Sequence, residues 1–169
     1  MRESRGSGLV LGVLLVLAGA GLLAARLVPG LEQWVGSSVG WPLIIVGFGC
    51  VLVLAGLLAR LTGLITGGSV IAGIGAILYY QSFTNDWASW AYAWTLLPGF
   101  AGLGAIIAGL VEGAFGRALR AGLWQILTSI ILFFIFASVL GGLNLLGLYW
   151  PVLVIILGVI MLLRPVLRL

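Results

Sequence analysis

Side chains suited to catalysis are scarce in this sequence. It contains no histidine, one cysteine and four carboxylates among 169 residues. Glu32, Asp86 and Glu112 lie near the ends of long apolar stretches, and Cys50 lies inside one, where we expect it to be a small core residue. Catalysis needs positioned acids, bases, nucleophiles or metal ligands. We therefore expect no enzyme, no catalytic residue, no metal site and no cofactor.

Two of the carboxylates allow a functional interpretation beside a simpler one. Glu112 follows an apolar span, where a carboxylate can relay protons, but Arg117 or Arg120 across a short turn offers it an ion pair. Asp86 could form a small extracytoplasmic polar cluster with Glu32 and Arg26. The simpler interpretation is that Asp86 caps a helical turn, because its side chain can accept from the free N–H groups there.

Aromatic residues cluster at what we predict to be the outer membrane boundary, where six tryptophans are joined by Tyr79, Tyr80, Tyr92 and Tyr149. Trp87, Trp90 and Trp94 have helical spacing. They could therefore share one face and form a platform for a lipid, quinone or pigment ring. The simpler interpretation is an aromatic belt at headgroup depth. The predicted interface tryptophans are Trp34, Trp41, Trp87, Trp90, Trp94 and Trp150.

The composition predicts an integral membrane protein. Hydrophobic residues make up 63% of the chain and charged residues 7%, and the mean hydropathy is +1.31, far outside the soluble range. The net charge of +4 is better explained by arginines beside an anionic leaflet than by nucleic acid. We predict an all-α polytopic helical bundle whose partners are the lipid bilayer and other membrane proteins or a second copy of itself.

Apolar runs of about 20 residues, the length that crosses a bilayer, predict six spans in a single transmembrane domain. The first run is too long for a signal peptide and is expected to stay as a span. The predicted spans are residues 9–28, 41–61, 66–83, 92–112, 123–140 and 149–168.

Arginine positions predict the orientation of these spans. With six crossings, seven of the eight arginines share one side, which the positive-inside rule makes cytoplasmic. Both termini are then cytoplasmic, in a plasma membrane of the bacterial inner-membrane type. The topology charges are Arg60, Arg117, Arg120, Arg164 and Arg168.

The spans form an internal repeat. Trp41 to Arg60, Trp94 to Glu112 and Trp150 to Arg168 are separated by 19, 18 and 18 positions, which predicts three helical hairpins related as parallel repeats. The fourth span carries Pro98-Gly99, where we expect a kink. It also carries a stripe of small residues at four-residue steps, which favours close helix packing: Ala101, Ala105, Gly109 and Gly113.

The stretch from Leu9 to Leu61, with Trp-Pro-Leu-Ile-Ile-Val-Gly between two apolar spans, resembles the transmembrane region of bacterial LiaI/LiaF-like envelope-stress proteins. The stretch from Leu123 to Arg164, with Tyr-Trp-Pro-Val-Leu-Val-Ile-Ile-Leu-Gly, is similar to a second copy. This resemblance implies a regulatory membrane protein that acts by contact with other membrane components. The soluble carboxyl-terminal domain of LiaF-like proteins has no counterpart in this sequence.

These observations favour a non-enzymatic multi-pass membrane protein with a structural, scaffolding or envelope-associated regulatory role, exerted through helix–helix contacts. The alternative is a small transporter or channel for an apolar or small solute, suggested by the repeat and by Pro98-Gly99. The sequence contains no ionisable group at the centre of a span to coordinate an ion.

Overall fold

The structure is a computed structural model, and it describes residues 12, 15–16, 19–21, 23, 27, 30–140 and 150–166. The predicted span 9–28 lies largely outside these residues. The chain divides into two units, Met1–Trp41 and Pro42–Leu169, which are described separately. Every regular element among the described residues is helical, so the predicted all-helical class is confirmed for them.

In the first unit, a short helix leads into the first long one. Helix α2 covers Leu31–Val35. Ser37 Oγ donates to the Trp34 carbonyl oxygen at 2.6 Å and accepts from the Gly40 N–H at 3.0 Å, so one hydroxyl links the end of α2 to the start of α3. A side chain at Gly40 would collide with the Trp34 carbonyl group, which explains why glycine begins α3.

Four helical stretches are long and apolar enough to cross a membrane: Gly40–Ala59, Thr62–Thr84, Trp87–Val111 and Phe115–Val139. The first, second and fourth are the helices α3, α4 and α7. The third consists of η1 (Trp87–Ser89), α5 (Trp90–Ala93), η2 (Trp94–Leu96) and α6 (Leu97–Val111). Helix α8 (Trp150–Val166) contains the shorter apolar stretch Pro151–Ile160.

Helix α7 begins earlier than the predicted span 123–140. Residues 115–122 lie between the predicted spans 92–112 and 123–140, yet they are the first turns of α7. Alanine, leucine and arginine are good helix formers, and Arg117 and Arg120 are both exposed on this segment. Arg117 and Arg120 therefore limit the apolar run in the sequence, but they do not limit the helix.

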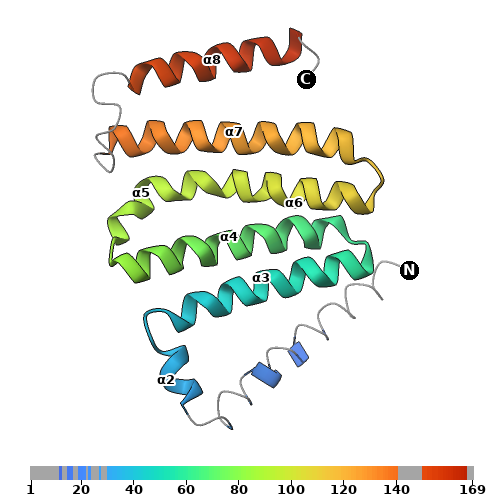
Figure 1. The fold of residues 1–169 in the computed structure, drawn as a ribbon, viewed down its shortest axis with the longest axis vertical. Coiled ribbons are helices and arrows are strands. Elements are labelled where there is room, and N and C mark those ends of the chain that lie inside the picture. Colours follow the sequence, from blue (N-terminus) through green and yellow to red (C-terminus); the bar gives the residue numbers. More distant parts are fainter. Residues whose placement is uncertain are drawn as a thin grey trace. The chain divides into compact units, whose positions relative to one another are not determined.

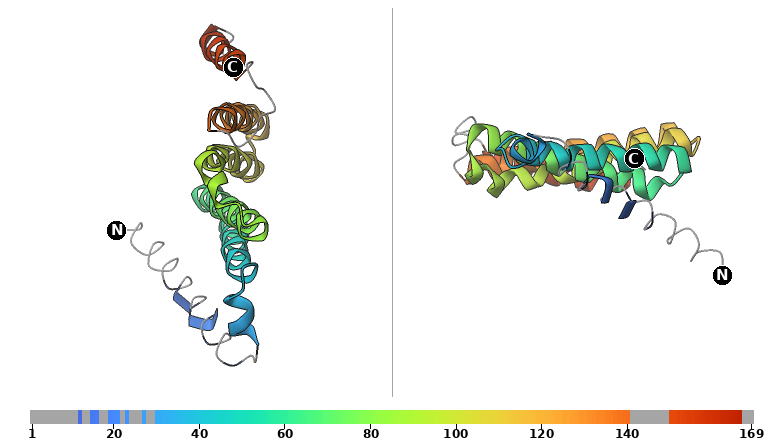
Figure 2. Two further views of the ribbon diagram at one scale, coloured as in Figure 1. Left: turned by 90° about the vertical axis from the view of Figure 1, so that its left-hand side faces the viewer. Right: turned by 90° about the horizontal axis from the view of Figure 1, so that it is seen from below.

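The long helices of the second unit lie side by side in a single row, in the order α3, α4, α6, α7 (Figures 1 and 2). Successive helices run in opposite directions, so the turns at Arg60 and Gly113 lie at one end and the turn at Asn85 lies at the other (Figure 1). These three turn residues have left-handed backbone conformations, with φ of 54°, 68° and 53° respectively. Between α3 and α4 only Arg60 and Leu61 lie outside the two helices.

Glycines allow α3 and α4 to approach backbone to backbone. A Cβ atom on Gly68 would lie 2.8 Å from both the Gly49 carbonyl oxygen and the Val53 nitrogen. On Gly75 it would lie 2.6 Å from the Val46 nitrogen. Atoms this close leave no room for a side chain, so the seam between the two helices depends on its glycines.

Helix α6 is packed on two sides rather than along one stripe. Toward α4, a Cβ atom on Gly104 would lie 2.7 Å from the Thr66 Cα atom. Toward α7, a Cβ atom on Gly102 would lie 2.7 Å from the Gly122 carbonyl oxygen, and one on Gly109 would collide with Ala118. A helix in the middle of a row needs small residues on both flanks.

The predicted packing stripe therefore needs correction. Gly109 is buried, but Ala101 and Ala105 are only half-buried. Gly113 is exposed and lies beyond the end of α6, where its φ of 68° suits glycine and terminates the helix. Cys50 is exposed rather than a core residue, because it lies on a face of α3 that no other described helix covers.

Few residues of the row are fully buried. In each membrane-length helical stretch, only 22–28% of the most apolar 18-residue window is buried within the chain. The buried hydrophobic side chains are few and include Leu52, Ile65, Ile77, Ile131 and Ile135. Most residues in these windows are therefore at least partly exposed within the described part of the chain, where they can contact lipid or other proteins.

A candidate ligand cavity beside an interrupted helix

The third membrane-length stretch is not one continuous α-helix. The 3₁₀ turn η2 separates α5 from α6, and Pro98 lies in the first turn of α6. Proline has no N–H group, and its ring clashes with the carbonyl group four residues earlier, which here belongs to Trp94. The interruption at Trp94 is where this clash is expected to act, and Leu97 N–H bonds instead to the Trp94 carbonyl oxygen. Pro98 thus explains the predicted distortion and its position.

A hydrogen bond from α7 stabilises the interruption. Ser129 Oγ donates to the Thr95 carbonyl oxygen at 2.6 Å, and Thr95 Oγ1 donates to the Tyr92 carbonyl oxygen at 2.6 Å. Ser129 and Thr95 are both buried. A backbone group in the irregular segment thereby obtains a partner where water is excluded, as a membrane interior requires.

A second hydrogen-bonded cluster joins the end of α4 to η1. The Asp86 carboxylate accepts from the Ser89 N–H at 3.3 Å, which confirms the predicted helix cap. Ser89 Oγ donates to the Asp86 carbonyl oxygen at 2.6 Å, and Gln81 Nε2 donates to Ser89 Oγ at 3.0 Å. These bonds fix the position of η1 against α4.

The same cluster determines how the Gln81 amide is oriented. A serine hydroxyl has one hydrogen, and that of Ser89 is used by the Asp86 carbonyl oxygen, so Ser89 Oγ can only accept from Gln81. Gln81 must therefore present its NH₂ group to Ser89. Its Oε1 atom is fully buried and has no hydrogen-bond partner in the described part of the chain. Gln81 thus joins α4 to η1 while its buried amide oxygen goes unpaired.

Between α4, α5, α6 and α7 lies a cavity of about 310 Å³, which we call the aromatic cavity. Its walls are mainly apolar, and four aromatic rings contribute to them. Tyr92 and Phe133 meet edge to face, with ring centroids 5.4 Å apart. Gly73 lies directly beneath the Phe100 ring, because a side chain at Gly73 would collide with it. The cavity is lined by Ala76, Ile77, Tyr80, Ser89, Tyr92, Ala93, Leu96, Phe100 and Phe133.

The tryptophans predicted as a possible platform do not line this cavity. Trp87, Trp90 and Trp94 are exposed, and Trp94 packs edge to face on Phe136 with centroids 5.5 Å apart. Their exposure fits the belt interpretation. Two other predicted interface tryptophans, Trp34 and Trp41, belong to the first unit, where Trp34 is exposed and Trp41 half-buried. Trp150 is the first residue of α8, and its side chain is outside the described set.

Sequence reasoning missed the residues that build the cavity. Gln81, Phe100 and Phe133 carried no predicted role, whereas Tyr80 and Tyr92 were assigned only to the aromatic belt. A signal for Gln81 existed, because an amide inside a predicted span needs an interhelical partner. Nothing in the sequence indicated that Phe100 would cross to Gly73.

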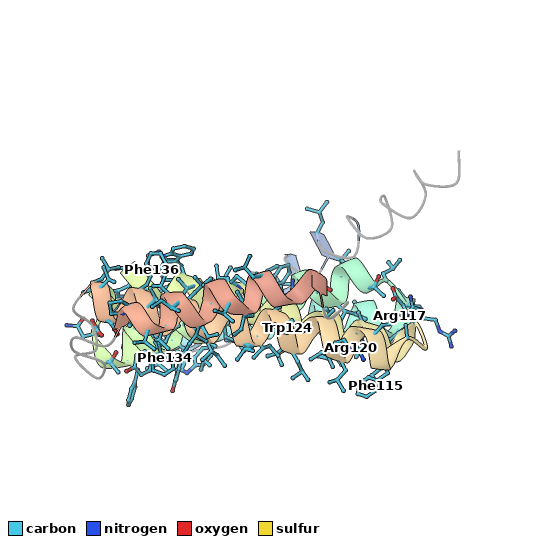
Figure 3. All side chains as sticks on the ribbon, turned by 90° about the horizontal axis from the view of Figure 1, so that it is seen from above. Phe115, Arg117, Arg120, Trp124, Phe134 and Phe136 are labelled. Atoms are coloured by element: carbon cyan, nitrogen blue, oxygen red, sulfur yellow. The ribbon has the colours of Figure 1, made fainter. Side chains whose placement is uncertain are left out.

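The opposite end of the row carries positive charge. Arg60, Arg117 and Arg120 are exposed, and Figure 3 shows Arg117 and Arg120 near one end of α7 with Phe134 and Phe136 near the other. A shallow hollow of about 190 Å³ lies along α7, lined by Arg120, Leu123, Trp124 and Leu127. Of the remaining topology charges, Arg164 lies in α8 without a described side chain, and Arg168 is outside the described residues.

The ion pair expected for Glu112 does not form. Glu112 is exposed at the end of α6, and it makes no salt bridge with Arg117 or Arg120, whose side chains are described and exposed as well. Exposed ion pairs contribute little free energy, so an ion pair would stabilise this turn only slightly.

Within the described residues, no three His, Cys, Asp or Glu side chains form a group that could hold a metal ion. The arrangement of the aromatic cavity is suited to ring contacts and hydrogen bonding.

Comparisons of the chain with protein-family models, with curated proteins and with solved structures find no match.

Proposed function

We propose that this chain is a non-enzymatic multi-pass membrane protein that acts through contacts made by its helix faces, in a structural, scaffolding or envelope-associated regulatory role. The observation that carries the proposal is the single row of helices (Figure 2). In a row, the inner helices use their flanks for each other and leave two faces uncovered. Described helices with so few fully buried residues are suited to contacting partners or further copies in the membrane.

The exposed side chains on these faces are large and apolar. Leu54 on α3 is 58% exposed and Leu103 on α6 is 46% exposed, although both lie within membrane-length stretches. Lipid tails can pack against such faces, and so can another helix, because helix association in membranes depends on packing and not on the exclusion of water. The uncovered faces thus support a role based on contact.

We further propose six spans as three parallel hairpins in a plasma membrane of the bacterial inner-membrane type, with both termini in the cytoplasm. Four stretches of membrane length support a polytopic arrangement. Exposed arginines at one end of the row and tryptophans toward the other match the positive-inside rule and the aromatic belt. The resemblance of the stretches around Trp41 and Trp150 to LiaI/LiaF-like regions is the reason for including a regulatory role.

The test is photo-crosslinking of the full chain in native membranes. Benzoylphenylalanine is placed at Leu54 in one variant and at Leu103 in another, and adducts are identified by mass spectrometry. We expect a discrete adduct to a second copy or to another membrane protein from at least one position. Recovery of the monomer alone from both variants, with lipid as the only crosslinked species, would contradict the proposal.

A transporter or channel is a second candidate, because a specific feature favours it. Interrupted spanning helices with nearby cavities are common at solute sites of transporters, and η2 lies beside the aromatic cavity. Flux of small uncharged solutes into proteoliposomes tests this candidate, with Pro98→Ala as the variant that restores a continuous helix. If the wild-type chain transports nothing above empty liposomes, this candidate is abandoned.

A further inference from the structure

We propose that the aromatic cavity binds the ring system of an uncharged, lipid-soluble molecule, about the size of two fused rings, that carries a hydroxyl or carbonyl oxygen. This inference goes beyond the proposed contact role and does not depend on the number of spans. It rests on the volume of the cavity, the chemistry of its walls and the way hydrogen bonds fix those walls.

The volume sets the size of the ligand. An apolar cavity of about 150 Å³ holds one benzene molecule, so a cavity of about 310 Å³ has room for two fused rings. Ligand sites in proteins usually begin at about 300 Å³. A single water or a small ion would leave most of this space unfilled.

The walls select a ring. Phe100, Phe133 and Tyr92 come from three different helices and line the same cavity. Aromatic pairs contribute about 0.5–1.5 kcal/mol beyond the free energy gained by burying their area, and a flat ligand can contact several of these rings at once. An acyl chain would fill the volume without this additional ring–ring stabilisation.

The polar groups select an uncharged ligand with one oxygen. Tyr80 and Tyr92 line the cavity, and among the described residues neither hydroxyl has a hydrogen-bond partner. A phenolic hydroxyl both donates and accepts, so either can bind a hydroxyl or a carbonyl oxygen of the ligand. No charged side chain lines the cavity, and the exposed arginines Arg60, Arg117 and Arg120 lie toward the other end of the row (Figures 1 and 3). A phosphate or carboxylate would therefore find no counter-charge.

The cavity is held open by bonds that do not involve its ring contacts. Ser129 binds the Thr95 carbonyl group and ties α7 to η2, while Gln81 binds Ser89 and ties α4 to η1. Walls fixed in this way lose little conformational entropy when a ligand binds. Tyr80 is 60% exposed, which places it at the edge through which a molecule dissolved in the bilayer would enter.

The experiment uses the purified full chain in a mild detergent and 1-naphthol as the probe. Binding is measured by equilibrium dialysis against matched empty micelles. We expect saturable binding by the wild type and about a tenfold weaker affinity for Ala76→Phe, whose added ring fills the cavity. The matched control is Ala91→Phe, because Ala91 is exposed and does not line the cavity; its affinity should equal that of the wild type.

A second variant, in which two tyrosines are replaced, tests the proposal if Ala76→Phe fails to fold. The double variant Tyr80→Phe with Tyr92→Phe keeps both rings and removes both hydroxyls, so we expect about fivefold weaker binding. Tyr79→Phe removes a hydroxyl outside the cavity and should change nothing. Equal, non-saturable uptake by the wild type, the double variant and empty micelles would overturn the proposal.

Extraction of the purified chain identifies what occupies the cavity in cells. We expect mass spectrometry to find an uncharged ring compound with the wild type and with Ala91→Phe, and to find about tenfold less with Ala76→Phe. Recovery of phospholipid as the sole extracted species, in equal amounts from all three, would contradict a ring-specific site.

Discussion

Ser129 Oγ on α7 donates a 2.6 Å hydrogen bond to the carbonyl oxygen of Thr95, a residue that lies 34 positions earlier, in the 3₁₀ turn before Pro98. The bond connects two neighbouring helical stretches at the 3₁₀ turn η2, which interrupts the third membrane-length stretch between α5 and α6. It also lies close to Gly99, since a Cβ atom on Gly99 would be 2.9 Å from Ser129 Oγ. Gly99 thus leaves room for the Ser129 hydroxyl, which bonds to the 3₁₀ turn η2.

Replacing Ser129 by alanine removes this bond and leaves the Thr95 carbonyl group without the hydroxyl. Interhelical hydrogen bonds in membrane proteins contribute about 0.6 kcal/mol on average and at most about 1.7, so we expect a loss of stability within that range. The measurement is unfolding in dodecyl sulfate mixed micelles, followed by circular dichroism. Thr128→Ala is the control, because Thr128 Oγ1 bonds only to Trp124 in its own helix; an equal loss in both variants would contradict the argument.

The glycine seam between α3 and α4 predicts a sharp difference between two neighbouring residues. Gly68→Ala places a Cβ atom 2.8 Å from backbone atoms of Gly49 and Val53, whereas Gly67→Ala meets nothing within 4 Å. Overpacking of a tight interface costs about 1–3 kcal/mol, so we expect Gly68→Ala to destabilise and Gly67→Ala to be neutral or stabilising. Both free energies of unfolding are measured in the same micelles, and equal values would show that the seam is looser than described.

Gln81 and Ser89 are hydrogen-bond partners, yet their replacements should behave differently. Ser89→Ala leaves the buried Gln81 amide with no partner for either of its polar atoms, and an unpaired buried group costs about 1–3 kcal/mol. Gln81→Leu removes the amide together with its unpaired Oε1 atom, so we expect a stability close to that of the wild type. The comparison is made by the same unfolding assay, and a larger loss for Gln81→Leu than for Ser89→Ala would contradict it.

The orientation of the row is testable with single cysteines in a Cys50→Ala background. Gly116→Cys lies at the end that carries Arg117 and Arg120, and Ala88→Cys lies in η1 at the opposite end; both positions are exposed. We expect a membrane-impermeant thiol reagent to label Ala88→Cys in intact cells and Gly116→Cys only after permeabilisation. Labelling of Gly116→Cys in intact cells would reverse the proposed orientation, and the unlabelled Cys50→Ala parent is the control.

The helices could be predicted from the sequence because bilayer thickness and hydropathy determine them. The predicted span 41–61 closely matches α3, and the predicted span 92–112 identifies the stretch that becomes α5, η2 and α6. The cap at Asp86 and the distortion before Pro98 were also predictable, because each follows from the local chemistry of one side chain.

The flanks by which the helices meet were not predictable. With 27 glycines in the chain, several small-residue stripes fit the sequence equally well, and only the tertiary arrangement selects Gly102 and Gly104 over Ala101 and Ala105. The cavity was missed for a related reason, since Phe100 lines it only because Gly73 on another helix has no side chain. Such features depend on pairs of residues that no periodicity within one helix connects.

The turn at Arg60 and Leu61 limits how this protein can be assembled. Because only two residues separate the end of α3 at Ala59 from the start of α4 at Thr62, neither helix can enter a bilayer by a full turn ahead of the other, a step of about 5.4 Å, without unwinding its own end. The connection is too short to allow such an offset. Helices α3 and α4 must therefore insert together, and any later movement must carry both.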